Sequence, residues 1–278
     1  MKGGSMAAIL TGASGNLGQE LIKQADFDFV QVNRNDWLNL DQIFASGIDV
    51  VIHAASDLHT RVDMYPTNLL DSNVLSTAKI LESVRKHNIP RFIYISSCSV
   101  YGTSLSSHEI SKCSPVSLNG ITKLLNEKLI EEYCSANKIK FEILRVFNLY
   151  GGQDRFSIFS NMKKSLENNQ PFILNNKGIA QRDFIHVSDI AGIILFILNT
   201  NMPYPYLNIG TGSATKVSFL VDLIKQKYPD FQVMHSEVQE AKYSRADISK
   251  LSNLIDWNFL RIEDYLHNEF KLNNNETD

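Results

Sequence analysis

The chain has 278 residues, of which 44% are hydrophobic and 21% charged, with a formal net charge of −3. Such a chain can bury a sizeable core, either as one large domain or as a core with a smaller appendage. The absence of a basic run gives no support for nucleic-acid binding, and no apolar run reaches the roughly 18 residues that a membrane span needs. We therefore expect a small-molecule ligand, no nucleic-acid partner and no membrane association.

The cysteines and the N-terminus bear on the compartment. Cys98, Cys113 and Cys134 form no C-x-x-C pair and cannot all pair with one another, so a reduced, cytoplasmic setting is the simplest account. A charged-then-apolar signal pattern is missing at the N-terminus, which also favours a cytoplasmic location. Residues 1–5 (MKGGS), ahead of Met6, resemble a cloning remnant and are left out of the fold prediction.

Short apolar runs alternate with helical patterns through the first 150 residues. Their length and their Ile, Val and Phe content are typical of buried parallel strands. In the third helical stretch, Ala78, Leu81 and Val84 recur at helical spacing and mark one buried face. The alternation predicts a doubly wound parallel sheet of the Rossmann type. The predicted elements are strand 7–10, helix 16–24, strand 29–32, helix 41–45, strand 50–54, helix 69–87, strand 92–96, helix 118–137 and strand 141–146.

The regular alternation of predicted strands and helices ends in the second half of the chain. Residues 6–150 are expected to form the Rossmann domain, with 181–207 returning to it. Residues 151–180 and 208–271 are expected to form a small α+β part that binds substrate. The predicted elements here are helix 158–167, strand 172–174, an extended segment 183–187, helix 189–198, strand 207–209, helix 217–227, strand 231–234 and short helices at the end.

The first predicted strand runs directly into a glycine-rich turn, Thr11-Gly12-Ala13-Ser14-Gly15-Asn16-Leu17-Gly18, which opens the first helix. Glycines permit the tight turn, the close approach of backbone to a pyrophosphate, and close helix–strand packing. The helix N-terminus adds free N–H groups for phosphates. Because strand, spacing and helix agree, the motif predicts a dinucleotide site rather than an ordinary turn. The expected contacts are Gly12, Ser14, Gly15, Asn16, Leu17 and Gly18.

The adenosine ribose is expected about 20 positions further on, at the end of the second strand. Asn33 and Arg34 stand there, where an NAD-selective protein usually carries Asp or Glu. A guanidinium without a neighbouring carboxylate suits a 2′-phosphate, which Arg can bind with paired hydrogen bonds. The sequence therefore favours NADP over NAD, and the alternative is that Arg34 is an ordinary surface charge.

The glycine-rich turn belongs to a set of segments found together in a known family. They are T-G-x-x-G-x-x-G at 11–18, H-A-A at 53–55, Asn73, I-S-S-C-S-V-Y-G at 95–102, R-V-F-N-L-Y-G at 145–151, R-D-F-I-H-V at 182–187 and L-N-I-G-T-G at 207–212. In this order, and over about residues 7–257, the chain resembles the extended short-chain dehydrogenase/reductases. Within them it is similar to the NAD-dependent epimerase/dehydratase family that modifies nucleotide sugars.

The resemblance implies roles for individual residues. Ser97 would hydrogen-bond the reacting sugar oxygen, Ser99 would line the sugar pocket, and Lys123 would hold the nicotinamide ribose. Asn148 and Arg245 would contact the phosphates of the nucleotide sugar. The other implied contacts are Asn39, Leu40, Ala54, Ala55, Asn73 and Phe147 for the cofactor, and Arg182 for the substrate, unless Arg182 serves in an ion pair with Asp183.

The catalytic segment departs from the family. The family uses Y-x-x-x-K, a tyrosine and a lysine one turn apart on one helix face. Here Lys123 is present but Asn119 occupies the tyrosine position, so the expected catalytic set is Ser97, Asn119 and Lys123. Neither Tyr101 nor Tyr133 is followed by a lysine four residues later.

This departure changes the expected chemistry. An amide hydrogen-bonds a sugar oxygen but exchanges no proton in a useful range, and losing acid/base help costs about 10²–10⁴ in rate. Asp57 and His59, on the loop after the third strand, are candidate substitutes, and a histidine titrates near neutrality. Cys98, Tyr101 and water acting through Ser97 are the further alternatives.

Two functions of different classes remain open. The first is an NAD(P)-dependent nucleotide-sugar 4-epimerase, 4-ketoreductase or dehydratase that transfers hydride at the sugar C4 with atypical acid/base chemistry. The second is a catalytically silent protein that binds NAD(P) and a nucleotide sugar as a partner subunit or sensor. Asn119 supports the second, whereas Ser97 and Lys123 favour the enzyme. No metal site is predicted, and a homodimer is expected because helices 69–87 and 118–137 pair across a two-fold axis in the family.

Overall fold

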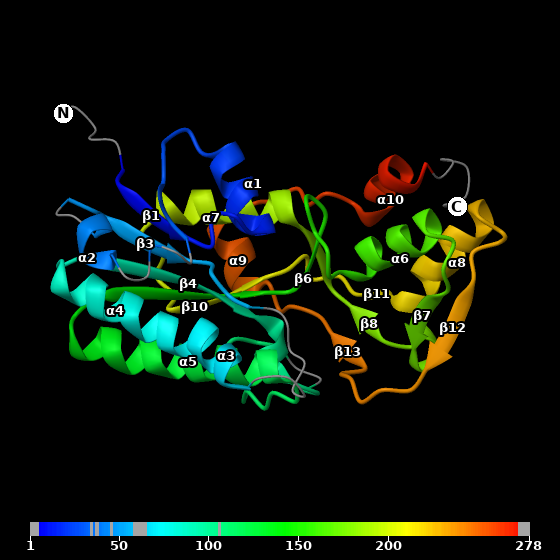
Figure 1. The fold of residues 1–278 in the computed structure, drawn as a ribbon, viewed down its shortest axis with the longest axis horizontal. Coiled ribbons are helices and arrows are strands. Elements are labelled where there is room, and N and C mark those ends of the chain that lie inside the picture. The colour runs from blue at the N-terminus through cyan, green and yellow to red at the C-terminus, as the bar shows by residue number, and fades with distance from the viewer. Residues whose placement is uncertain are drawn as a thin grey trace.

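The computed structural model describes residues 6–33, 36, 39–44, 47–57, 66–104 and 107–271. The larger of its two lobes contains a six-stranded parallel sheet in the order β10-β5-β4-β3-β1-β2 (Figure 1). The chain steps from β1 to β2 and then to β3 on the other side of β1, so the predicted doubly wound sheet is confirmed. The strands are β1 (Ala8–Thr11), β2 (Val30–Val32), β3 (Val50–His53), β4 (Arg91–Ser97), β5 (Lys140–Val146) and β10 (Tyr206–Ile209).

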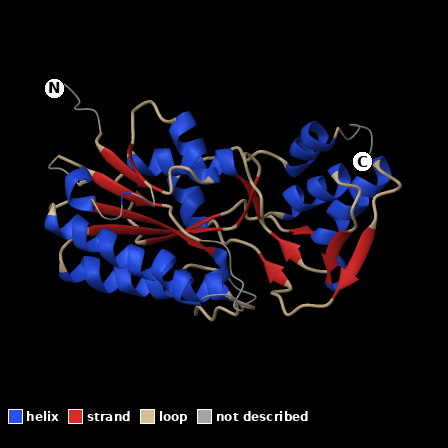
Figure 2. Ribbon diagram, in the orientation of Figure 1, coloured by secondary structure: helices blue, strands red, loops and turns tan. Residues whose placement is uncertain are grey.

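Helices cover both faces of this sheet (Figure 2). On one face α1 (Asn16–Gln24) packs against α7 (Val187–Leu198), and their apolar residues join the inward side chains of β1, β3 and β5. The other face is covered by α2 (Leu40–Ile43), α4 (Ser76–Lys86) and α5 (Leu118–Ala136). Strands buried on both sides explain why they are continuous apolar runs in the sequence.

The helix predicted at 69–87 is continuous but not uniform. α3 (Pro66–Leu70) passes through a π-helical turn (Asp71–Leu75) into α4. π-turns of this kind often occur at functional sites. This one contains Asn73, which is buried.

The smaller lobe has its own apolar core, which includes Phe159, Phe172 and Leu220. Two parallel strands and three helices surround that core, and the short strands of the pair β6–β9 and of the three-stranded sheet β11-β8-β13 lie toward the larger lobe (Figure 1). The elements are β6 (Asn148–Tyr150), α6 (Ile158–Glu167), β7 (Phe172–Asn175), β8 (Gln181–Arg182), β9 (Phe184–His186), β11 (Thr215–Lys216), α8 (Val217–Lys227), β12 (Val233–Ser236), β13 (Tyr243–Ser244) and α10 (Ile262–Phe270).

The chain returns to the larger lobe a second time, which the sequence did not predict. The expected substrate-binding part included 208–271, but β10 extends to Ile209, and α9 (Ser249–Leu254) contacts β10. Ala246 and Leu251 are buried in the core beside α1 and α7. The segment from Ala246 to Leu254 therefore belongs to the larger lobe, because its apolar side chains are buried there.

Candidate active site

A cavity of about 910 Å³ opens beside the carboxyl ends of the sheet strands and extends to the smaller lobe. Its walls include the glycine-rich turn, the end of β4, the start of α5, the loop after β6 and strands β7 and β8. The carboxyl edge near the β1–β3 switch point is where doubly wound sheets bind ligands. Most predicted site residues line this cavity: Gly12, Ser14, Gly15, Asn16, Leu17, Gly18, Ala54, Ser97, Ser99, Asn119, Lys123, Phe147, Asn148 and Arg182.

The glycine-rich turn packs directly against the end of β3. Gly12 has φ +75°, and a Cβ there would lie 2.7 Å from the backbone nitrogen of Ala55. A Cβ on Gly18 would likewise collide with the backbone at Gly12 and Ala13. No side chain caps the start of α1 at Gly15, so its first N–H groups remain available to a phosphate.

A buried hydrogen-bond chain holds the ends of β1 and β3 together beneath this turn. The Thr77 hydroxyl donates to the Asn73 carbonyl (2.7 Å), so it accepts from His53 Nε2–H (2.9 Å). The neutral ring then accepts at Nδ1 from the Thr11 hydroxyl (2.6 Å), which itself accepts from the Ala55 N–H (3.2 Å). Burial lowers the pKa of His53 to about 3, with the Lys123 charge as the smaller cause.

Asn16 joins the start of α1 to the loop that follows β6. Its amide nitrogen donates to the Gly151 carbonyl (2.8 Å), and its oxygen accepts from the Gln153 N–H (2.7 Å). Gly151 and Gly152 have φ +85° and +64°, and a Cβ on Gly152 would lie 2.5 Å from the Asn16 oxygen. The nitrogen and the oxygen of the Asn16 side-chain amide therefore both fix this loop against the dinucleotide motif.

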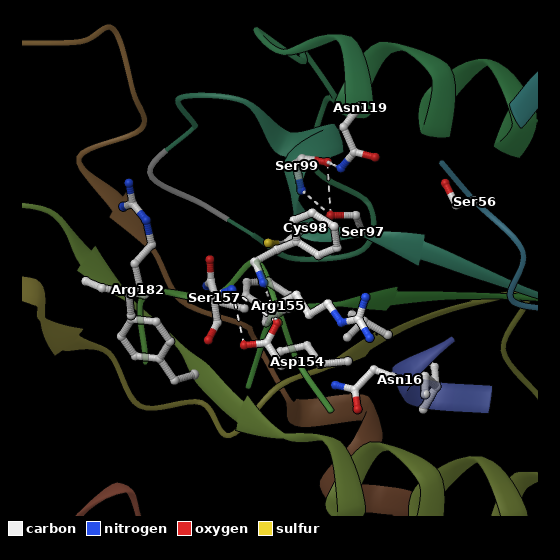
Figure 3. A pocket seen from close by; sticks show the side chains of 18 of the residues that line it. Asn16, Ser56, Ser97, Cys98, Ser99, Asn119, Asp154, Arg155, Ser157 and Arg182 are labelled. Atoms are coloured by element: carbon white, nitrogen blue, oxygen red, sulfur yellow. Dashed lines mark hydrogen bonds between the residues drawn. The ribbon is translucent and has the colours of Figure 1, made fainter. Parts of the chain in front are cut away.

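The polar groups at the end of β4 form a short chain (Figure 3). Ser97 Oγ accepts from the Ser99 N–H (3.2 Å) and from the Ser99 hydroxyl (2.9 Å). Asn119 Nδ2 donates to the Ser99 hydroxyl (3.2 Å), while its Oδ1 is buried and accepts from no described residue. With two bonds accepted, Ser97 has its own O–H left to donate.

Lys123 lies one turn along α5 from Asn119 and is buried. Its ammonium donates to the Ile95 carbonyl (2.7 Å) and lies 4.8 Å from the centre of the Tyr94 ring. Burial lowers the pKa of Lys123 to about 8, while the charge of Glu127 raises it by less. Lys123 can therefore gain or lose a proton close to neutral pH.

The substrate side of the cavity contains Asn148 and Arg182. The Asn148 amide donates to the Asp183 carbonyl (2.8 Å). Arg182 pairs with Glu240 (2.6 Å), whereas the suggested ion pair with Asp183 does not form. The Asp183 carboxylate instead accepts from Thr211, Gly212 and Ala246, and burial raises its pKa against the effect of these bonds.

Several predicted contacts lie away from the cavity. Leu40 is buried in the core under α2 and α4, and Arg245 is exposed above the Tyr243 ring. Neither lines the cavity, nor do the exposed residues Asn33, which follows β2, and Asn39, which precedes α2. Arg34 lies outside the described residues, as does His59.

Two further predicted contacts act on the backbone of the turn and its neighbouring loop. Ala55 packs against Gly12 through its backbone. Asn73 accepts from the Asp57 N–H (2.6 Å) and donates to the Asp57 carbonyl (3.0 Å), so it fixes the loop after β3.

The candidate replacements for the missing tyrosine have different surroundings. Tyr101 is buried, donates to Asn208 (2.7 Å) and accepts from Arg145 (3.1 Å), and burial raises its pKa strongly. Burial likewise raises the pKa of Cys98 to about 11, so its thiol stays protonated near neutral pH. Asp57 lines the cavity.

The loop after β6 supplies cavity residues that the sequence did not single out. Asp154 accepts from the N–H groups of Phe156 and Ser157, and Ser157 caps α6. Arg155 lines the cavity beside them (Figure 3). The glycine pair at 151–152 was the available signal, since it marks a turn that leads into a capped helix.

The described part of the chain holds no group of three His, Cys, Asp or Glu side chains placed to bind a metal ion. None of the helices described is long and apolar enough to cross a membrane.

Comparisons with known proteins identify the family. The profile of the NAD dependent epimerase/dehydratase family matches residues 8–210. A protein of Methanocaldococcus jannaschii with the provisional name UDP-glucose 4-epimerase is 34% identical over 72% of this chain and 68% of its own length. The UDP-glucuronate 4-epimerase of Thermodesulfobacterium geofontis is 28% identical over 86% of this chain and 76% of its own.

Solved structures show the same fold. The structure of MoeE5 in complex with UDP-glucose and NAD superposes with a TM-score of 0.84 at 25% identity, covering 95% of this chain and 97% of that one. The dinucleotide turn, the doubly wound sheet and the matched profile define an extended short-chain dehydrogenase/reductase. This chain belongs to the NAD-dependent epimerase/dehydratase family.

Proposed function

We propose that this protein binds a nicotinamide dinucleotide and a nucleotide sugar and exchanges a hydride at the sugar C4, as a 4-epimerase, dehydratase or 4-ketoreductase. The observation that carries the proposal is the cavity itself, which brings the glycine-rich turn, Ser97, Asn119 and Lys123 together with the smaller lobe. The names of the relatives supply the ligand class, since they include UDP-glucose with NAD and a UDP-glucuronate 4-epimerase.

The residues present fit a dinucleotide. Gly12 and Gly18 leave room for close backbone packing, and the uncapped start of α1 faces the cavity for the pyrophosphate. Lys123 would hold the nicotinamide ribose, and Phe147 lines the same cavity. When bound, the nicotinamide supplies or accepts the hydride.

NAD is the cofactor that we now favour. The preference for NADP depended on Arg34, which lies outside the described residues. The carboxylate of Asp36 accepts from the Asn33 N–H (2.7 Å) at the end of β2, and a carboxylate there repels a 2′-phosphate. The MoeE5 structure also contains NAD.

The proposed acid/base chemistry differs from that of the family. Ser97 donates a hydrogen bond to the sugar oxygen, and Asn119 orients Ser97 through Ser99. Because Asn119 has no proton to exchange, we assign proton exchange to water that reaches the sugar oxygen beside Ser97. The buried charge of Lys123 favours negative charge on that oxygen.

Binding of the dinucleotide is the first test. NADH and NADPH are added separately to the purified protein, and thermal unfolding is followed. A ligand at about 100 times its Kd stabilises the native state by about 2.7 kcal/mol, so NADH should raise the melting temperature measurably. Turnover is then measured with a panel of UDP-sugars and their 4-keto forms. If neither nucleotide shifts the melting temperature, the proposed binding of a nicotinamide dinucleotide is wrong, and the proposed hydride transfer fails with it.

Asn119 also supports a second candidate, a silent protein that binds the same ligands. Replacing Asn119 by Tyr distinguishes the two. An enzyme adapted to asparagine loses turnover in Asn119→Tyr, whereas a silent protein that kept its other site residues has no turnover to lose and gains it.

We also propose that the protein is a homodimer. Leu70 and Leu75, on the α3–α4 helix, and Ile121 and Leu125, on α5, are each about half exposed, with exposures of 46–48%. Ile121 and Leu125 share one face of α5, and the two helices pack side by side (Figure 1). A second copy of the chain that covers these side chains would form a four-helix interface.

A further inference from the structure

Arg182 has one carboxylate partner within the described ranges, and it is not the neighbour in sequence. Asp183 is fully engaged with four donors from Thr211, Gly212 and Ala246. The Arg182 guanidinium instead reaches Glu240 at 2.6 Å. The side chains of this pair are 14% and 25% exposed, so the pair is only partly solvated.

Glu240 lies on the wall between two cavities. It lines the candidate active site together with Arg182, and it also lines a second cavity of about 610 Å³. Lys177 and Lys242 line the second cavity, and both side chains are exposed. Neither lysine pairs with a carboxylate in the part of the chain that the structure describes.

The segment that carries Glu240 lies between β12 and β13 and has no regular secondary structure. Besides Arg182, it is held by Asn176, whose amide donates to Glu240 (2.9 Å) and to the Val238 carbonyl (2.8 Å) and accepts from the Val238 N–H (3.1 Å). A rotation of the Glu240 side chain toward the second cavity would give up its bonds to Arg182 and Asn176 but would break no element of the fold.

We propose that Glu240 is an affinity-setting gate for the anionic part of the ligand. In the closed state its carboxylate neutralises Arg182. In the open state the carboxylate lies in the second cavity near Lys177 and Lys242, and Arg182 binds a phosphate of the ligand. This inference rests on the proposed function, because it takes the diphosphate of a nucleotide sugar as the anion.

The gate lowers the observed affinity for the anion. A ligand that binds only the open state has an apparent affinity reduced by the fraction of molecules that are open. Removing the carboxylate charge while keeping the side-chain shape should therefore tighten binding. A partly exposed ion pair is worth little more than about 1 kcal/mol, so the expected gain for Glu240→Gln is about three- to tenfold.

The test is titration calorimetry with UDP on four proteins: wild type, Glu240→Gln, Arg182→Met and the double variant. UDP should bind Glu240→Gln about three- to tenfold more tightly than wild type. In the Arg182→Met background the same change should have no such effect, because the gated cation is gone. Glu237→Gln, an exposed neighbour on the same segment, removes the same charge outside the pair and controls for net charge.

Uridine serves as the matched ligand without phosphate. Its affinity should be unchanged by Glu240→Gln, because it presents no anion to Arg182. Unchanged or weaker UDP binding by Glu240→Gln would overturn the gate, and so would equal tightening in the Arg182→Met background. If no folded variant binds UDP at all, the gate and the proposed nucleotide-sugar function both fail. UDP binding without the Glu240 effect removes only the gate.

Discussion

Among single residues, His53 shows how burial sets a protonation state. Its two ring nitrogens connect Thr11 to Thr77, and each nitrogen has a defined role in that chain. A protonated ring would place a second donor, at Nδ1, against the Thr11 hydroxyl, whose own hydrogen would then need a new acceptor, while the bond from Nε2 to Thr77 would be unchanged. The neutral form is therefore built into the strand ends that support the dinucleotide turn.

This neutral histidine makes stability depend on pH. The folded pKa is about 3, below the ordinary value of 6.5, so the unfolded chain binds the proton more readily. The contribution is complete above pH 6.5 and declines as pH falls from 6.5 towards 3, by about 1.4 kcal/mol per pH unit. Between pH 7 and pH 5 His53 should therefore cost wild type about 2 kcal/mol of unfolding free energy.

The measurement is urea unfolding at pH 7, 6 and 5. His53→Gln is expected to be less stable than wild type at pH 7 but to lose less stability on acidification. His235→Gln, at an exposed histidine, shows the background effect of such a substitution. Parallel pH curves for His53→Gln and wild type would contradict the assigned protonation state.

At the scale of elements, the helix that follows the glycine-rich turn also positions a loop of the cavity wall. Asn16 is the first residue of α1, and its amide bonds Gly151 and Gln153 at the start of the loop that carries Asp154 and Arg155. Because both ends of the amide are used, no other residue type of similar size supplies the same pair of bonds. The dinucleotide motif and the loop after β6 are thus held as one unit.

Asn16→Ala should loosen this unit. Two lost hydrogen bonds are expected to lower the unfolding free energy by about 1–3 kcal/mol. We also expect bound NADH to raise the affinity for UDP through the Asn16 contact, and this coupling should shrink in Asn16→Ala because the loop is no longer fixed to α1. Thermal unfolding and UDP titrations with and without NADH measure both effects.

Gln19→Ala is the matched control on the same helix. Its amide donates to the Ala13 carbonyl (2.8 Å) and makes no contact with the loop at 151–153. It should lower stability without changing the coupling between the two ligands. Equal loss of coupling in both variants would show that the loop contact has no special role.

For the whole molecule, the exposed apolar face of α3–α4 and α5 predicts the oligomeric state. In sedimentation velocity runs, wild type should behave as a dimer, and Ile121→Glu as a monomer, because a buried unpaired carboxylate is costly at an interface. Phe219→Glu introduces the same charge at an exposed aromatic residue of the smaller lobe and should leave the dimer intact. A wild-type monomer at micromolar concentration would contradict the proposal.

The sequence predicts many elements of both lobes well because their signals are local. Each main-sheet strand is a short apolar run, and the helices α1, α6 and α8 begin and end at the predicted residues. What it could not predict depends on distant partners. The Arg182–Glu240 pair joins residues 58 apart, and the Asn16 amide reaches residues more than 130 positions away. The exposed position of Arg245 likewise follows from how β13 meets β8.

The path of the chain between the lobes limits how this protein can be taken apart. After β5 it enters the smaller lobe for α6 and β7, returns for α7 and β10, leaves again for α8 and β12, returns for α9, and ends in the smaller lobe with α10. Neither lobe is therefore formed by one continuous stretch of the chain. Exchanging the substrate lobe with that of a relative requires three separate grafts, and a single cut after the first 150 residues would leave the main sheet without β10.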